Sequence, residues 1–326
     1  MQLHDYMKYI DLACWLGFSP RFQWTGRPTN GKPYTLEKRA LFVLGVSCAI
    51  YQLFAQFIHW YQNGRMAEET TAFVTQISET CGALTLTSVG FAHIYALIRN
   101  RHLIESVFQE LQEIYPRARD RHYRCQHYFD LAMLIMKIEF VLFMAFLVYY
   151  NSAPILLLLW EYQQRQELSF TLQANTWFPW KVHGSAIGFG VAVLIIILIS
   201  TVDVAFAIVA VHLVCIFVFQ LKLHYDGLAS QLLNLDSRQP DANQQLRNVI
   251  AYHSCILQIT EQINHILNPL FMTSLVGSTI AICMTSAAIL LLDLASAFKY
   301  INNLAAFVLY HFVICYLGTE VTSADY

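Results

Sequence analysis

Six long apolar runs are the feature of this sequence that most constrains its fold. Each is at least about as long as the ~20 residues that a helix needs to cross a bilayer. Inside hydrocarbon the backbone must satisfy its own hydrogen bonds, so we expect these runs to be helices. The runs cover residues 40–61, 71–98, 129–160, 185–221, 270–292 and 300–319.

The composition of the 326-residue chain agrees with a membrane protein. Hydrophobic residues make up 56% of it, charged residues only 13%, and the mean hydropathy is +0.44. Soluble domains carry roughly 25% charged residues, so an ordinary soluble enzyme is disfavoured. The net charge of −2 offers no basic surface for nucleic acid. We predict an all-α, polytopic membrane bundle of six spans with a cytoplasmic helical extension, in contact with the lipid bilayer.

The fourth run is too long for one simple crossing. Its 37 residues would measure about 55 Å as a helix, against a hydrocarbon core of ~30 Å. Two spans joined by a hairpin are the alternative, but residues 200–203 contain neither Gly nor Pro. We therefore favour one long helix whose inner half leaves the membrane and packs on protein.

The positive charges indicate an orientation. Lys and Arg in alternate flanking segments number 15 on the N-terminal side and 4 on the other. The positive-inside rule then places the N-terminus in the cytoplasm, and six spans place the C-terminus there too. Residues 1–20 lack the apolar core of a signal peptide, and their pattern predicts a short amphipathic helix before Pro20.

These assignments divide the chain into five parts. The first is a cytoplasmic N-terminal segment, the second holds spans one to four with the long fourth helix, and the third is a cytoplasmic helical segment. Spans five and six and a short C-terminal end complete the chain. The respective ranges are 1–39, 40–221, 222–269, 270–319 and 320–326.

Two cytoplasmic segments show helical periodicity. In 99–128 an apolar face ends before Pro116, and in 242–267 a longer stripe is predicted to stop before Pro269. With the inner half of the fourth run they can form a small bundle under the membrane. Intramolecular packing and an oligomer contact both explain their apolar faces, and the sequence leaves the two open.

Enzyme motifs are absent or weak. The chain has no HExxH and no Gly-rich phosphate loop. His122, Cys125 and His127 suit no standard zinc spacing, so we read them as a solvated turn. We expect no catalytic residue, no metal and no cofactor. The eight cysteines avoid the predicted outer loops, so we expect no disulfide framework.

Two carboxylates inside spans are candidates for function, because ionisable groups in a membrane are costly. Asp203 interrupts the fourth run, and the competing interpretation is an interfacial or bundle-paired carboxylate. Glu79 lies in the second run among several Ser and Thr residues, including Thr75. This polar face indicates a cavity, although small hydroxyl residues also serve helix packing.

The third run is rich in aromatic residues near its outer end. Phe140, Phe143, Phe146, Tyr149 and Tyr150 lie within eleven positions. An aromatic pocket with few polar groups suits a small apolar ligand. An interfacial aromatic belt is the alternative, and it is the favoured interpretation for the two tyrosines.

Tyr252-His253 lies on the last predicted cytoplasmic helix, and Pro269 and Ile282-Cys283 follow it along the chain. In these residues the sequence resembles the insect odorant receptor family. The sixth run ends in LYHFVICYLGTEVTS, with the expected residues in three positions but Tyr310 where the family usually has Gln. Those three positions are Phe312, Cys315 and Gly318.

The resemblance implies a function. Family members are odorant-gated cation channels that work as heterotetramers with a shared coreceptor, in the plasma membrane of sensory neurons. Their pocket for small volatile organic ligands lies in the outer halves of spans two, three, four and six. From those halves we select, as candidate ligand-binding residues, Thr75, Glu79, Phe143, Phe146, Tyr149, Ile187 and Phe189.

Two further expectations concern a missing seventh helix and the alternative functions. Family chains continue into a seventh, pore-lining helix, so we expect this sequence to be a truncated product or an incomplete gene model that lacks the pore helix. A gustatory receptor-type channel subunit and a small-solute transporter are the alternative functions. A transporter would predict an internal repeat, and none is evident between the first and second three runs.

Overall fold

The computed structural model confirms an all-helical chain over the residues that it describes. Within the described residues, nine helical segments follow one another in the order given below, and six of them are long and apolar enough to cross a membrane. The described residues are 2–25, 27–28, 34–63, 70–116, 122–165, 170, 172, 176–182, 184–236, 238–291 and 294–324. The segments are η1 (Leu3–Met7), α1 (Lys8–Leu16), α2 (Leu36–Asn63), α3 (Thr70–Arg99), α4 (Arg101–Ile114), α5 (Cys125–Arg165), α6 (Ala186–Leu233), α7 (Ala242–Leu291) and α8 (Leu294–Ala324).

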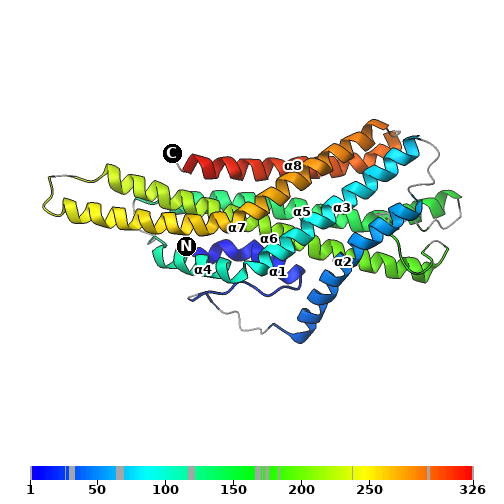
Figure 1. Cartoon of the computed structure of the whole chain (residues 1–326), viewed down its shortest axis with the longest axis horizontal. Helices are drawn as coiled ribbons and strands as arrows, with labels where there is room; N and C mark the ends of the chain where they lie inside the picture. The colour runs from blue at the N-terminus through cyan, green and yellow to red at the C-terminus, as the bar shows by residue number, and fades with distance from the viewer. Residues whose placement is uncertain are drawn as a thin grey trace.

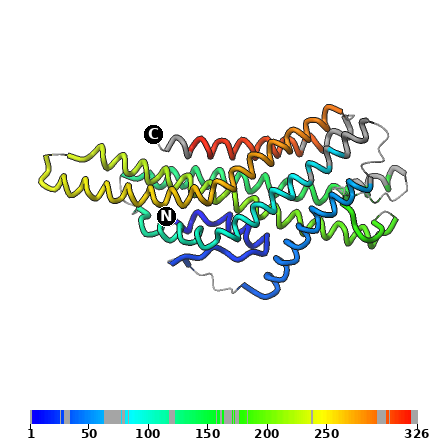
Figure 2. Tube along the Cα trace, viewed as in Figure 1, coloured from blue at the N-terminus to red at the C-terminus, as the bar shows by residue number. Residues whose placement is uncertain are grey.

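The helices form an elongated bundle (Figure 1). The end of α6 and the start of α7, coloured yellow-green to yellow, make a hairpin that projects beyond the other helices at one end. Both chain ends lie toward this hairpin half of the molecule (Figure 2). Helix α2 diverges from the bundle at its first residues and converges on it further along.

Helix α6 is the central element of the fold, and the prediction of one long fourth helix is confirmed. It runs unbroken for 48 residues, which is about 70 Å at ~1.5 Å per residue. Ser185 caps its start by accepting a hydrogen bond from the backbone N–H of Gly188 at 3.1 Å. Residues 202–224 of this helix are buried almost all round, so neighbouring helices and not lipid surround them.

The N-terminal segment packs against α6, and the predicted amphipathic helix is confirmed as η1 and α1. Tyr6, Met7 and Ile10 are fully buried in the shared core. At the end of α1, a Cβ on Gly17 would lie 2.9 Å from Cβ of Ala205. Only a residue without a side chain permits this close approach of the two backbones.

Helix α4 lies beside this N-terminal segment and confirms the periodicity predicted between residues 99 and 128. Its buried face includes Val107 and Phe108, and the helix ends two residues before Pro116. The ring of Phe108 stacks on Trp24 at a centroid distance of 4.8 Å. Arg101 donates a hydrogen bond to the carbonyl of Pro20 at 3.0 Å, which fixes the chain between α1 and α2 onto α4.

The prediction that a helix ends before Pro269 is wrong. Helix α7 continues through this proline for 50 residues and joins the predicted segment 242–267 to the fifth span. A proline inside a helix removes one backbone hydrogen bond and costs roughly 3 kcal/mol. Ile266, Leu267 and Leu270 on either side are buried in the main core, and this packing offsets the lost bond.

Candidate functional site

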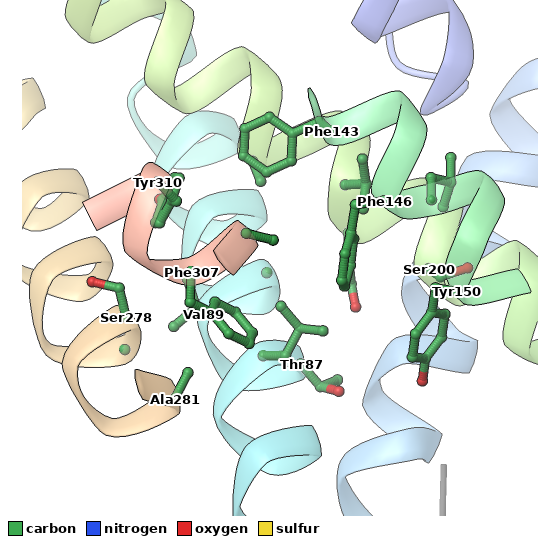
Figure 3. Close-up of a pocket in the computed structure, with 18 of the residues that line it drawn as sticks. Thr87, Val89, Phe143, Phe146, Tyr150, Ser200, Ser278, Ala281, Phe307 and Tyr310 are labelled. Atoms are coloured by element: carbon green, nitrogen blue, oxygen red, sulfur yellow. The ribbon is translucent and has the colours of Figure 1, made fainter. Parts of the chain in front are cut away.

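A cavity of about 420 Å³ lies where six helices meet in the middle of the bundle (Figure 3). Helices α2, α3, α5, α6, α7 and α8 all contribute to its lining. Its walls are mainly apolar, with a small set of polar groups. The lining includes Gln52, Gln56, Thr85, Thr87, Glu139, Phe143, Phe146, Tyr149, Tyr150, Ser200, Asp203, Gly277, Ser278, Phe307 and Tyr310.

Aromatic rings from α5 and α8 form one wall of the cavity. Phe143 and Tyr310 meet edge to face, with centroids 5.7 Å apart and an interplanar angle of 76°. Phe146 stacks on Tyr150 at 5.9 Å one turn further along α5. In Figure 3 the rings of Phe143 and Phe146 lie between α5 and the residues of α8 and α3. Such rings offer large apolar surfaces with fixed geometry, which suits a small apolar ligand.

Hydrogen bonds between α8, α7 and α3 support this aromatic wall. The hydroxyl of Tyr310 on α8 donates to Oγ of Ser274 on α7 at 2.8 Å. The same Oγ lies 3.0 Å from Nε2 of His93 on α3. Three helices are thus tied together beside the cavity, and the phenol of Tyr310 is held in one orientation.

A close contact between α3 and α7 shapes another part of the cavity lining. A Cβ on Gly277 of α7 would lie 2.1 Å from Cγ2 of Val89 on α3, so the two helices approach at this glycine. Both residues line the cavity. The volume of the cavity therefore depends on the separation of α3 and α7.

Hydrogen-bond acceptors collect along the lining. Among the residues that the structure describes, four buried oxygens of cavity residues have no hydrogen-bond donor. They are Oε1 of Gln52, Gln56 and Glu139, and Oδ1 of Asp203. Gln52 donates through Nε2 to Oγ1 of Thr176 at 2.9 Å, which leaves its oxygen as the unused group.

The structure brings some of the candidate ligand-binding residues together and not others. Phe143, Phe146 and Tyr149 all line the cavity. Ile187 is 82% exposed at the start of α6, and Phe189 packs on Phe170 at 5.3 Å in a separate cluster, so neither reaches it. The side chains of Thr75 and Glu79 on α3 lie outside the described residues.

Sequence reasoning missed several lining residues. Gln52 and Gln56 lie one helical turn apart on α2, a span from which no candidate was chosen. Their spacing in an apolar run was the available signal. Glu139, near the start of the third run, was not among the candidates, and it is 2% exposed on the lining. Asp203, which had two competing interpretations, lies on the same lining.

The remaining sequence motifs lie elsewhere in the described chain. His122 of the predicted turn lies 3.1 Å, through Nδ1, from Oγ of Ser230. The hydroxyl of Tyr252 lies 2.6 Å from Nδ1 of the buried His224, which ties α7 to α6. His253 is exposed one position further along. On the outer surface of the last two long helices, the exposed motif residues are Cys283, Phe312 and Cys315.

Comparison with known proteins agrees with this architecture. The family profile described as 7tm Odorant receptor matches residues 74–325. Putative odorant receptor 69a, isoform A, of Drosophila melanogaster is 58% identical over 326 residues, covering 100% of this chain and 83% of that protein. Isoform B is 31% identical over 322 residues, covering 98% and 82%.

A solved structure shares the fold. The insect olfactory receptor OR5 of Machilis hrabei matches with a TM-score of 0.73 and 16% identity, over 99% of this chain and 81% of that one. The same receptor in complex with eugenol gives the same values. At this identity the match establishes the fold. The family profile and the relative that is 58% identical along the whole chain show that this multi-pass membrane protein belongs to the insect odorant receptor family, which consists of receptors rather than enzymes.

Proposed function

We propose that this odorant receptor chain is the odorant-binding subunit of a heteromeric, odorant-gated cation channel. In this proposal small volatile organic compounds bind in the cavity lined by α2, α3, α5, α6, α7 and α8. The channel forms with the shared coreceptor as a hetero-oligomer, in the plasma membrane of sensory neurons. The N-terminus lies in the cytoplasm, which the excess of 15 over 4 positive charges supports.

The cavity is the observation that carries the proposal. Its volume of about 420 Å³ falls within the ~300–1,000 Å³ of sites for small molecules. Phe143, Phe146 and Tyr149 line it, and they stay our choice as ligand contacts. A volatile compound offers few polar groups, so burial against such rings supplies most of its affinity.

Exposed apolar residues on α7 support the partnership with another subunit. Leu257 is 49% exposed and Ile250 is 56% exposed, on the part of the helix before Pro269. Large apolar side chains that the described helices leave uncovered are typical of protein contact surfaces. We assign this face of α7 to the contact with the coreceptor.

A displacement experiment tests ligand binding. The purified chain in lipid nanodiscs is loaded with the fluorescent apolar probe N-phenyl-1-naphthylamine and titrated with volatile compounds of different shapes. We expect saturable displacement whose midpoint depends on the shape of the compound. Displacement no different from that in empty nanodiscs would rule out the cavity as a binding site.

A second experiment tests the subunit assignment. The tagged chain is coexpressed with the coreceptor and purified in mild detergent. We expect the two to copurify, and Leu257→Glu to reduce the recovered coreceptor, because it places a charge on the contact surface. As a control, Leu233→Glu changes a residue that is 85% exposed at the end of α6. Equal recovery with both variants would contradict the assigned face.

A further inference from the structure

Asp203 is a carboxyl group placed within the apolar first half of α6. It lies on the lining of the cavity and is 7% exposed. Burying a carboxyl group costs free energy unless a partner satisfies its oxygens. Either the helices packed here supply hydrogen-bond donors to the carboxyl oxygens, or a bound ligand supplies them.

The neighbouring helix leaves room for the carboxyl group. A Cβ on Gly90 of α3 would lie 2.8 Å from both Cγ and Oδ1 of Asp203. Any other residue at position 90 would push the carboxyl group away. The close approach places the Cα of Gly90, which is not a hydrogen-bond donor, against one side of the group.

Two hydroxyl groups of the lining donate their hydrogen bonds to other partners. Oδ1 of Asp203 has no hydrogen-bond donor among the described residues. Ser200, one turn before it, donates its hydroxyl to Oδ1 of Asn151 at 3.0 Å or to the carbonyl of Ile197 at 3.1 Å. Tyr310 across the cavity gives its hydroxyl to Ser274.

Other polar side chains of the cavity lining also have oxygens without a hydrogen-bond donor among the described residues. Gln52, Gln56 and Glu139 each present a buried oxygen that, within the described chain, accepts no hydrogen bond. All three line the cavity together with Asp203. Unsatisfied buried acceptors are rare in folded proteins, and each calls for a physical account. A cavity with spare acceptors is complementary to a ligand that brings a hydrogen-bond donor.

From this geometry we infer that Asp203 is the polar anchor of the cavity and accepts a hydrogen bond from the hydroxyl or ammonium group of an otherwise apolar ligand. The aromatic wall of Phe143 and Phe146 holds the apolar body of the same ligand. This inference rests on the proposed function, since it assigns one ligand class to the proposed site. It adds that alcohols and amines gain affinity over hydrocarbons of equal shape, because only they donate a hydrogen bond to Asp203.

The test uses three ligands of the same size and shape. Propylbenzene, 2-phenylethanol and 2-phenylethylamine differ only in the terminal methyl, hydroxyl or amino group. Their affinities are measured by displacement of N-phenyl-1-naphthylamine from the purified chain in nanodiscs. The deciding quantity is the affinity of each polar ligand relative to propylbenzene, compared between wild type and variant, because this ratio cancels general effects of the substitution.

Asp203→Ala should weaken both polar ligands about tenfold relative to propylbenzene, since the hydrogen bond to the carboxyl group is lost. Asp203→Asn should weaken the amine by about as much and the alcohol less, because the amide keeps one acceptor oxygen. Asp130→Asn is the matched control, because it makes the same change of group at an exposed carboxyl of α5 that does not line the cavity. It should leave the ratios within about twofold. Glu139→Gln tests the other carboxyl of the lining as a competing anchor.

Each outcome decides between the claims. If no ligand displaces the probe from wild type, the proposed function fails. If propylbenzene displaces it but the ratios stay constant in both Asp203 variants, only the anchor fails, and a bound water explains the carboxyl group instead. If only Glu139→Gln lowers the affinity of the polar ligands relative to propylbenzene, the anchor is Glu139 and the inference is overturned.

A measurement on the wild-type protein covers the case in which the Asp203 variants do not fold. Infrared difference spectra are recorded on adding 2-phenylethanol or propylbenzene to the wild type and to Glu139→Gln. The alcohol alone should shift a carboxyl band in both proteins. If the wild-type spectrum lacks this shift, or if Glu139→Gln abolishes the shift, the assignment to Asp203 is overturned.

Discussion

Tyr310 donates a hydrogen bond to Ser274 across the contact between α8 and α7, with 2.8 Å between the two oxygens. The ring of the same tyrosine forms the edge-to-face contact with Phe143 on the cavity wall. One side chain therefore joins the packing of the two helices to the shape of the cavity. A change confined to its hydroxyl separates these two contributions.

Tyr310→Phe should lower the free energy of unfolding by about 1 kcal/mol, because it removes one hydrogen bond and keeps the ring. The affinity for an apolar ligand should stay nearly unchanged, since the ring still lines the cavity. Unfolding in mixed detergent micelles measures the first quantity and probe displacement the second. Tyr162→Phe is the control, at a tyrosine that is 53% exposed. Equal stability of the two variants would contradict a role of the Tyr310 hydroxyl in helix packing.

Gly277→Ala should separate α3 from α7 and lower stability by roughly 1–3 kcal/mol, as overpacked contacts do. The added methyl would lie 2.1 Å from Cγ2 of Val89, and this contact cannot persist. Because both residues line the cavity, the affinity for N-phenyl-1-naphthylamine should change as well. Unfolding and probe titration measure the two effects.

Two further variants isolate the cause of that effect. Gly190→Ala changes a glycine of α6 with nothing within 4 Å of its added Cβ, and it should stabilise by roughly 0.5–1 kcal/mol through the backbone alone. Val89→Ala combined with Gly277→Ala removes the atom that collides, so it should recover most of the lost stability. A double variant as unstable as Gly277→Ala alone would show that the contact is not the cause.

Phe146→Ala should weaken the binding of apolar ligands about tenfold, since losing roughly 60 Å² of apolar contact removes about 1.5 kcal/mol. Displacement of the fluorescent probe by propylbenzene measures the loss. Phe54→Ala on α2 is the matched control, because that ring is 65% exposed and does not line the cavity. Unchanged affinity for every ligand would remove Phe146 from the site.

The sequence was sufficient for features that depend on local composition. Six apolar runs became six long helices, and the absence of Gly and Pro in residues 200–203 correctly favoured one continuous α6. Phe143 and Phe146 were found because aromatic residues are concentrated near the predicted outer end of the third run. These features follow from helix periodicity and from the length needed to cross a bilayer.

Features that depend on contacts between distant segments were not accessible in the same way. Pro269 reads locally as a helix stop, and only the packing of its neighbours in the core shows why α7 continues. The role of Gln52 depends on which helices face α2, and a single sequence does not contain that information. Ile187 was chosen from its place near the end of a span, whereas exposure depends on the neighbours that the fold provides.

The docking of α1 on α6 leads to a prediction about chemical reactivity. Cys14 on α1 is 2% exposed, and burial raises the pKa of its thiol from 9.0 to about 11. A raised pKa means less thiolate, the reactive form, so at pH 8 the reactive fraction should be about a hundredfold below that of an ordinary thiol.

Cys14 should therefore react with N-ethylmaleimide much more slowly than Cys255, which is only partly buried on α7. Mass spectrometry of the native protein gives the rate at each cysteine. Gly17→Leu should accelerate the labelling of Cys14 and leave Cys255 unchanged, because Cβ at position 17 would lie 2.9 Å from Cβ of Ala205 and force α1 away from α6. Rapid labelling of Cys14 in the wild type would instead mean that α1 does not rest on α6, and the buried N-terminal core around Ile10 would then be wrong.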